Sequence, residues 1–231
     1  MMKNIKIIAF DADDTLWVNE PYFQETEHQF CALLEDFLPH HTVSQELFRT
    51  EMENLSLYGY GVKGFMLCMI ETISKITDNT AKIELVNKTI DLGKELLKKP
   101  IELIDGVEEV LKKLNSDYRL VMATKGDLLD QERKLINSGL EKYFHHIEIM
   151  SNKRSEDYQK IFKHLDCKPE NFLMVGNSIK SDILPVLELG GYAIHVPYHT
   201  TWVHEQVNQN VENPEFIQTK NITEILNYLI L

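Results

Sequence analysis

The sequence has little that would place it outside ordinary water-soluble proteins. It has three cysteines in 231 residues, widely spaced and without a CxxC pair, which predicts reduced thiols and excludes a disulfide scaffold. No stretch approaches the ~20 apolar residues of a membrane span. The apolar run at 5–10 is short and ends in acidic residues, unlike a signal peptide. We therefore expect a cytoplasmic protein without membrane insertion.

Basic charge is also scarce. The chain has 24 Lys and Arg against 36 Asp and Glu, a formal net charge of -12. This excess argues against nucleic acid or an anionic membrane as a partner. It does not exclude a small anionic substrate, because one lysine and a metal ion can reverse the sign of the charge within a site. The hydrophobic content of 43% excludes a disordered chain.

The order of predicted elements indicates the fold class. The run at 5–10 predicts a buried strand, and from 20 to 99 apolar residues recur three and four apart, which predicts helices. Breaks near 39–42, 59–64 and 77–80 divide this block into four helices. Further strands are predicted at 118–123, 146–150, 172–175, 192–196 and 216–218, alternating with helices at 106–114, 128–137, 155–165, 179–189 and 222–231.

This alternation predicts an α/β fold, a doubly wound Rossmann-like parallel sheet with an inserted all-helical domain. We expect a core domain at 1–17 and 101–231 and the helical domain at 18–100. Open parallel sheets bind ligands at the carboxyl ends of their strands. The residues just past each predicted strand are therefore the candidates for function.

Four predicted strand ends carry polar side chains. Asp11, Asp13 and Asp14 follow the first strand, and Thr124 follows the second. The remaining two strand ends carry Lys153, and Asn177 with Asp182.

These groups suit phosphoryl transfer, which needs positioning and charge neutralisation. Clustered carboxylates repel one another, and Mg²⁺ relieves this when substrate phosphate completes its shell. Asp11 could attack phosphorus, and Asp13 could protonate the leaving oxygen and then activate water. Thr124 and Lys153 could hold the phosphoryl group.

The motifs resemble those of the haloacid dehalogenase-like (HAD) superfamily. The segments are KIIAFDADDTLW at 6–17, VMATKGD at 121–127, Lys153, and MVGNSIKSD at 174–182, and the helical insertion resembles the family's cap domain. The resemblance implies roles for Asp11 as nucleophile, Asp13 as general acid and base, and Thr124 and Lys153 as phosphoryl-binding residues. It also implies Mg²⁺ held by Asp11, the Asp13 main-chain carbonyl and the fourth motif, through Asn177 or Asp182.

Two departures from the family pattern matter. The fourth motif begins Gly176-Asn177 where the family often has Gly-Asp, which leaves Asn177 and Asp182 as alternative metal ligands. Lys153 is followed by Arg154 where the family usually has proline. The founding dehalogenases lack an aspartate at the position of Asp13, so its presence favours phosphate chemistry.

We therefore expect a Mg²⁺-dependent phosphatase acting on a small phosphorylated metabolite through an aspartyl-phosphate. One alternative is a phosphomutase or a phosphonate-cleaving relative, for which Lys63, Lys75 or Lys82 would supply a cap lysine. Another is a phosphate-sensing module without turnover. The GxGxxG at 59–64 follows a helical segment rather than a strand, so it predicts a turn between helices and no dinucleotide site. The sequence leaves the substrate and the oligomeric state open.

Overall fold

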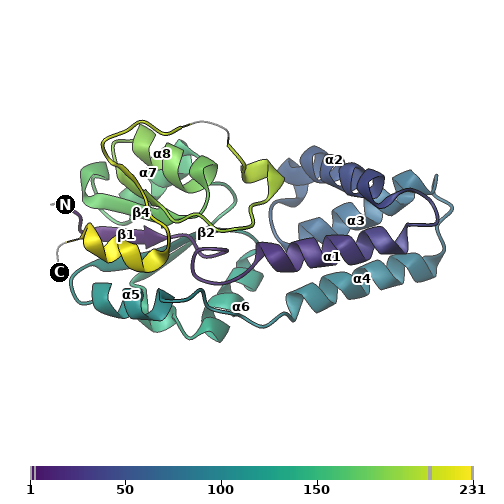
Figure 1. Ribbon diagram of the computed structural model, residues 1–231, viewed down its shortest axis with the longest axis horizontal. Helices are drawn as coiled ribbons and strands as arrows, with labels where there is room; N and C mark the ends of the chain where they lie inside the picture. Colours follow the sequence, from purple (N-terminus) through teal and green to yellow (C-terminus); the bar gives the residue numbers. More distant parts are fainter. Residues whose placement is uncertain (1, 3, 208–209, 230–231) are drawn as a thin grey trace. The chain divides into compact units, whose positions relative to one another are not determined.

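A computed structural model describes residues 2, 4–207 and 210–229 of the chain (Figure 1). Its strands are β1 Ile7–Phe10, β2 Arg119–Lys125, β3 His146–Met150, β4 Phe172–Gly176, β5 Tyr192–His195 and β6 Phe216–Gln218. Its α-helices are α1 Glu20–Leu33, α2 His40–Tyr58, α3 Val62–Ile76, α4 Ile83–Leu97, α5 Val107–Leu114, α6 Leu128–Ser138, α7 Ser155–His164 and α8 Leu184–Glu188.

The strands form one parallel sheet in the order β3-β2-β1-β4-β5-β6. This confirms the predicted doubly wound α/β core. The first strand lies at the centre, where Phe10 pairs with Met122 of β2 and Val175 of β4. The carboxyl ends of β1, β2 and β4 therefore lie at one edge of the sheet, level with one another.

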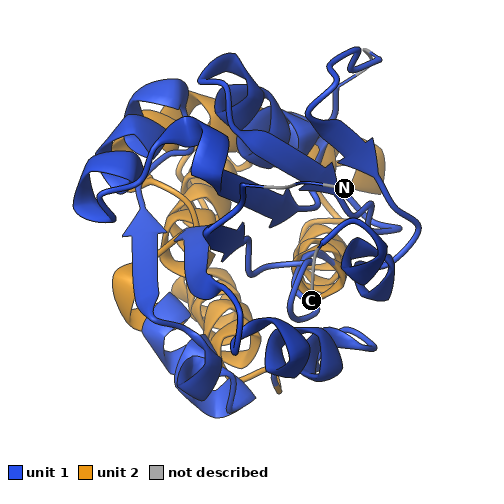
Figure 2. Ribbon diagram, turned by 90° about the vertical axis from the view of Figure 1, so that its left-hand side faces the viewer, with its two compact units in different colours: residues 1–20, 101–125, 131–231 blue, residues 21–100, 126–130 orange. Residues whose placement is uncertain are grey.

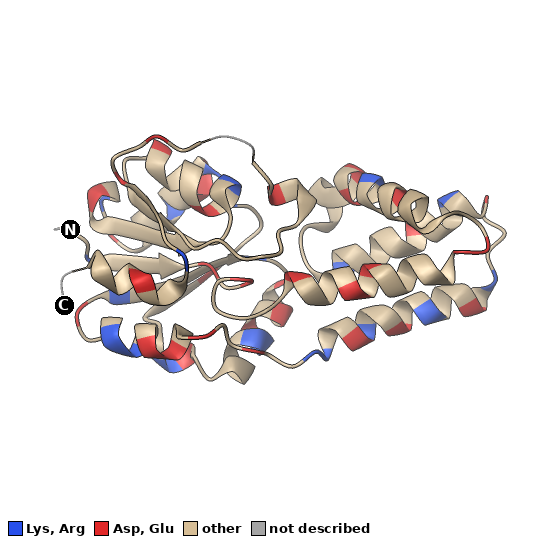
Figure 3. Cartoon of the chain, in the orientation of Figure 1, with Lys and Arg blue, Asp and Glu red and all other residues tan. Residues whose placement is uncertain are grey.

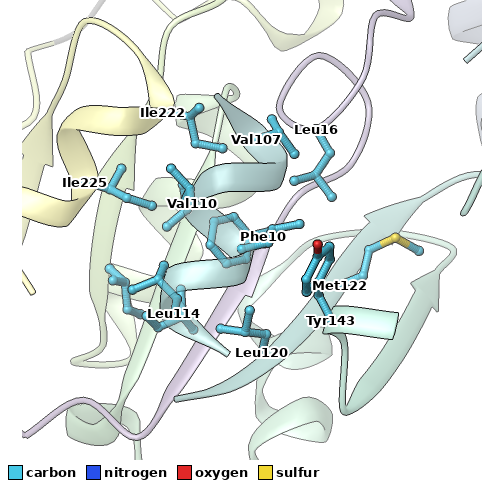
Figure 4. Packing of buried hydrophobic residues seen from close by; sticks show 14 of the residues in the cluster. Phe10, Leu16, Val107, Val110, Leu114, Leu120, Met122, Tyr143, Ile222 and Ile225 are labelled. Carbon is cyan, nitrogen blue, oxygen red and sulfur yellow. The ribbon is translucent and has the colours of Figure 1, made fainter. Parts of the chain in front are cut away.

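Both faces of the sheet are buried, because side chains alternate along each strand. On one face, Phe10 and Met122 pack with α5 residues such as Val110 (Figure 4). On the other face, Ala9 and Val121 pack with Tyr158 of α7. This double burial explains why β1 is apolar without interruption.

The chain divides into two compact units by its internal contacts (Figure 2). One comprises residues 1–20, 101–125 and 131–231, and the other comprises 21–100 and 126–130. The second contains α1 to α4 around a core of its own, with Phe30, Leu47 and Met69 fully buried or nearly so. Gly59–Gly61 separate α2 from α3, so a helix precedes the glycine-rich segment as expected.

Two predicted helices differ from the structure. The segment expected as one helix at 179–189 is a π-helical turn, Ile179–Ile183, followed by the short α8. Pro185 lies in the first turn of α8, where its missing N–H costs least. The helix expected at 222–231 is a 3₁₀ helix, Ile222–Asn227, and residues 230–231 lie outside the described part.

Charge and cysteine placement agree with an ordinary globular chain. Acidic and basic residues alternate along α4, whereas in α5 the glutamates lie in the first turn and the lysines in the last turn, so neither helix carries charge of one sign (Figure 3). Cys31 and Cys68 are buried, Cys167 is half-buried, and all three are free thiols. Within the described ranges, no helix is both long and apolar enough to span a bilayer.

Candidate active site

The structure brings three of the predicted site residues into direct contact at the centre of the sheet edge. Lys153 Nζ lies 2.5 Å from Asp11 Oδ1 and 2.6 Å from Asp182 Oδ1. Asp11 follows β1, Lys153 follows β3, and Asp182 follows β4, so only the fold can bring them together. The Lys153 side chain is 1% exposed. The result is a buried ammonium group between two carboxylates.

Asp182 reaches this position because Gly176 has no side chain. A Cβ on Gly176 would lie 2.2 Å from Asp182 Oδ2, well inside van der Waals contact. The same Oδ2 accepts a hydrogen bond from the backbone N–H of Ser178 at 3.0 Å. Both oxygens of Asp182 therefore have protein partners, one in Lys153 and one in the loop after β4.

The buried charges do not balance. Burial raises the pKa of Asp11 to about 7, with Lys153 opposing the rise and Asp182 adding to it. The two carboxylates raise the pKa of Lys153 despite its burial, so its ammonium form is favoured. One ammonium group faces two carboxylates, and a cation beside Asp11 would relieve the remaining negative charge.

The oxygen atoms near Asp11 suit a hard cation. Thr15 Oγ1 lies 3.5 Å from Asp11 Oδ2 and 3.4 Å from Asn177 Oδ1, so both oxygens lie beside the same hydroxyl. His195 Nε2 donates a hydrogen bond to the Asn177 main-chain carbonyl at 3.0 Å and so helps to fix the backbone of this residue. In the described part of the chain, no three His, Cys, Asp or Glu side chains form a metal cage. An open set of this kind matches Mg²⁺, which keeps several waters and takes substrate oxygens.

Asp13 lies among three hydrogen-bond donors. Its Oδ1 accepts from the Trp17 indole N–H at 2.7 Å and from Lys134 Nζ at 3.0 Å, and its Oδ2 accepts from Gln131 Nε2 at 2.9 Å. Gln131 Nε2 also lies 2.9 Å from Thr124 Oγ1. The predicted residues therefore fall into two contact groups, one around Lys153 and one around Gln131.

Two residues beside the first motif have structural roles. Asp14 has φ 62°, a left-handed conformation that aspartate tolerates. Its carboxylate accepts from the backbone N–H groups of Asn19 and Glu20 and caps α1. Trp17 is fully buried in the core. Its ring packs in the core, and its indole N–H donates to Asp13.

Sequence reasoning missed Glu205. Its Oε1 lies 2.6 Å from Lys125 Nζ, and its Oε2 accepts from the hydroxyls of Ser178 and Ser181 at 2.5 and 2.6 Å. Burial opposes ionisation of Glu205, but Lys125 and the serines outweigh it and lower its pKa to about 2. Glu205 lies in the polar segment after β5, where no motif marks it.

Lys125 directly follows Thr124, yet its ammonium is paired with Glu205 rather than with Asp11. Its Nζ also donates to Ser181 Oγ at 2.9 Å. The strand ends of β2 and β4 and the loop after β5 are thus joined by one charged network. Asp11 instead pairs with Lys153.

A parallel sheet in this order, with a buried aspartate at the end of its central strand, defines a Rossmann-like α/β protein with a polar site at one sheet edge. A family model of haloacid dehalogenase-like hydrolases matches residues 5–190. The chain belongs to this family of hydrolases.

Individual relatives agree with this assignment. A haloacid dehalogenase-like family hydrolase from Xanthomonas campestris has a similar crystal structure, with a TM-score of 0.86 and 35% identity, covering 96% of this chain and 88% of that one. The glyceraldehyde 3-phosphate phosphatase of Methanopyrus kandleri is 26% identical over 185 residues, 78% of each chain. A predicted phosphoglycolate phosphatase from Haemophilus somnus shares the fold, with a TM-score of 0.65, 16% identity and 99% coverage of both chains.

Proposed function

We propose that the protein is a Mg²⁺-dependent phosphatase that hydrolyses a small phosphorylated metabolite through an aspartyl-phosphate on Asp11. The observation that carries the proposal is the buried Lys153 ammonium, held 2.5 Å from Asp11 at the end of the central strand. An ammonium in that position can bind a phosphoryl oxygen while Asp11 faces phosphorus. The similarity to a phosphatase named for glyceraldehyde 3-phosphate supports the same substrate class.

In this proposal the Asp11 carboxylate attacks phosphorus, and the bond from phosphorus to the ester oxygen breaks. Asp13 gives its proton to that oxygen, so the alcohol leaves neutral and Asp13 becomes a carboxylate. Asp13 then takes a proton from water, whose oxygen attacks phosphorus and releases phosphate and Asp11. Thr124 and Lys153 hold the phosphoryl oxygens through both steps.

A bound Mg²⁺ would neutralise phosphoryl charge and fix the phosphoryl group against Asp11. We propose that Asp11, the Asp13 main-chain carbonyl and Asn177 hold it. The Asn177 side-chain oxygen accepts only a long contact from Thr15 at 3.4 Å among the described residues, so it is available to a cation. Both Asp182 oxygens are engaged, which supports a role for Asp182 in holding Lys153 rather than the metal.

We further propose that residues 18–100 act as the cap over the site. This would exclude bulk water from the acyl-phosphate until water enters in the second step. Two of the three lysines considered for phosphonate cleavage have ion-pair partners inside the helical unit. Lys63 pairs with Asp127 at 2.9 Å and Lys75 pairs with Glu53 at 2.6 Å. These ion pairs give the phosphatase the better support.

The experiment is phosphate release from a panel of small phosphomonoesters that includes glyceraldehyde 3-phosphate, with and without Mg²⁺. The wild type should release phosphate, chelation should abolish the release, and Asp11→Asn should be inactive. Asp105→Asn, an exposed aspartate in the same unit, is the matched control and should keep full activity. Equal rates for wild type and Asp11→Asn would refute the nucleophile. A stable phosphorylated protein without phosphate release would favour a sensor.

A further inference from the structure

The hydrogen bonds of Asp13 distinguish its two oxygens. A carboxylate oxygen has about two in-plane acceptor positions. Oδ1 uses both, with Trp17 and Lys134 as donors. Oδ2 has one protein donor, Gln131, and keeps a position for a ligand. Oδ2 is therefore the oxygen that can exchange a proton with a substrate, and the orientation of that oxygen depends on Gln131.

The side-chain amide of Gln131 is fixed by its surroundings. Nε2 lies within hydrogen-bond distance of Asp13 Oδ2, Thr124 Oγ1 and the Lys125 main-chain carbonyl, at 2.9, 2.9 and 2.7 Å. Exchanging the amide oxygen and nitrogen would set an oxygen against a carboxylate and a carbonyl, so the orientation found is the favourable one. One amide thus bridges the ends of β1 and β2.

Packing alone does not account for a glutamine at this position. Gln131 is 2% exposed, and its Oε1 is buried without a hydrogen-bond partner among the described residues. An unpaired buried carbonyl is destabilising. A methionine would fill a similar volume without that cost. The N–H groups of Gln131, which face Asp13 and Thr124, are what distinguish the two side chains.

We infer that Gln131 is a positioning residue for catalysis, which holds Asp13 Oδ2 toward the leaving oxygen and aligns the Thr124 hydroxyl with the phosphoryl group. The inference rests on the proposed phosphatase function. In the first step the proton on Asp13 Oδ2 passes to the ester oxygen as the bond to phosphorus breaks, giving a neutral alcohol and the Asp13 carboxylate. A misdirected Oδ2 leaves the departing group as an alkoxide.

The test is the dependence of the rate on the leaving group. An alkyl phosphate expels a strongly basic alkoxide and needs the proton, whereas 4-nitrophenyl phosphate expels a weakly basic phenolate and does not. Gln131→Met should lower kcat for the best alkyl phosphate about 10²-fold, within the range for general acid catalysis. It should lower kcat for 4-nitrophenyl phosphate much less. Asn137→Met, at an exposed amide of the same helix, should leave both rates unchanged.

Gln131→Glu provides a second variant, because it keeps the size of the side chain and sets an acceptor against Oδ2. It should show the same selective loss on the alkyl substrate. The ratio of the two rates does not depend on how much protein folds, so partial misfolding cannot imitate the result. Equal losses on both substrates, or no loss on either, would overturn the role of Gln131. A wild type that hydrolyses neither substrate would instead refute the proposed phosphatase.

Discussion

Replacing Glu205 by glutamine tests whether its buried ion pair with Lys125 stabilises the fold. The side chains of the pair are 12% and 14% exposed, so solvent screens the interaction weakly. The pKa of Glu205 falls from an ordinary 4.5 to about 2. At about 1.4 kcal/mol for each pH unit, this corresponds to about 3 kcal/mol of preferential stabilisation of the carboxylate. Glu205→Gln should lose stability of this order at pH 7.

The pH dependence has a definite sign. Because the pKa is lower in the folded protein, the carboxylate contributes its full stability above pH 4.5, and the contribution is lost as the pH falls toward 2. The difference in unfolding free energy between wild type and Glu205→Gln should therefore be largest at neutral pH. It should shrink between pH 4.5 and pH 3.

Urea unfolding followed by tryptophan fluorescence is a suitable assay. Both tryptophans, Trp17 and Trp202, belong to the unit that contains Glu205, so their signal reports its unfolding. Glu109→Gln is the control, because it removes an exposed, solvent-screened pair with Lys113 and should leave stability nearly unchanged. A Glu205→Gln variant as stable as wild type, or a loss that stays constant from pH 7 to pH 3, would refute the reasoning.

Three further substitutions probe the sheet edge. Gly176→Ala would place a Cβ 2.2 Å from Asp182 Oδ2. We therefore expect the unfolding free energy measured in urea to fall by about 1–3 kcal/mol and kcat to fall as well. An unchanged unfolding free energy would contradict the close approach. Burial raises the pKa of Asp14 to about 7, so wild-type stability falls as the pH rises from about 4 to 7. Asp14→Asn keeps the helix cap and should gain in melting temperature relative to wild type between pH 5 and pH 8, and an unchanged difference would contradict this. Lys153→Met leaves two buried carboxylates facing each other, so it should cost about 3–5 kcal/mol in the same urea assay, and a loss below 1 kcal/mol would show that the pair is not buried as described.

The separate proposals fail separately under these tests. The stability predictions concern the fold and hold whether or not the protein turns over a phosphate ester. Loss of phosphate release in Asp11→Asn tests the nucleophile, and the leaving-group ratio of Gln131→Met tests the orientation of Asp13. A negative result for Gln131→Met leaves the nucleophile in place, whereas a wild type without phosphatase activity removes the basis of both functional proposals.

The sequence by itself determined the fold class, because the signals for it are local. Uninterrupted apolar runs predict strands buried on both faces, and apolar residues three and four apart predict the helices of 20–99. The parallel pairing of the six strands agrees with those signals. Local patterns did not show the π-helical turn at Ile179–Ile183 or the 3₁₀ form of Ile222–Asn227, because tertiary packing selects these geometries.

The contacts of the candidate site were decided by the tertiary structure. Glu205 lies 80 residues from Lys125 along the chain, and Gln131 lies 118 residues from Asp13, and no periodicity links them. Motifs predict which side chains stand at the strand ends, since a strand and its following turn are local. Which donor neutralises or orients each side chain depends on long-range packing. Burial strengthens the electrostatic interaction between the partners and makes an unpaired buried charge costly.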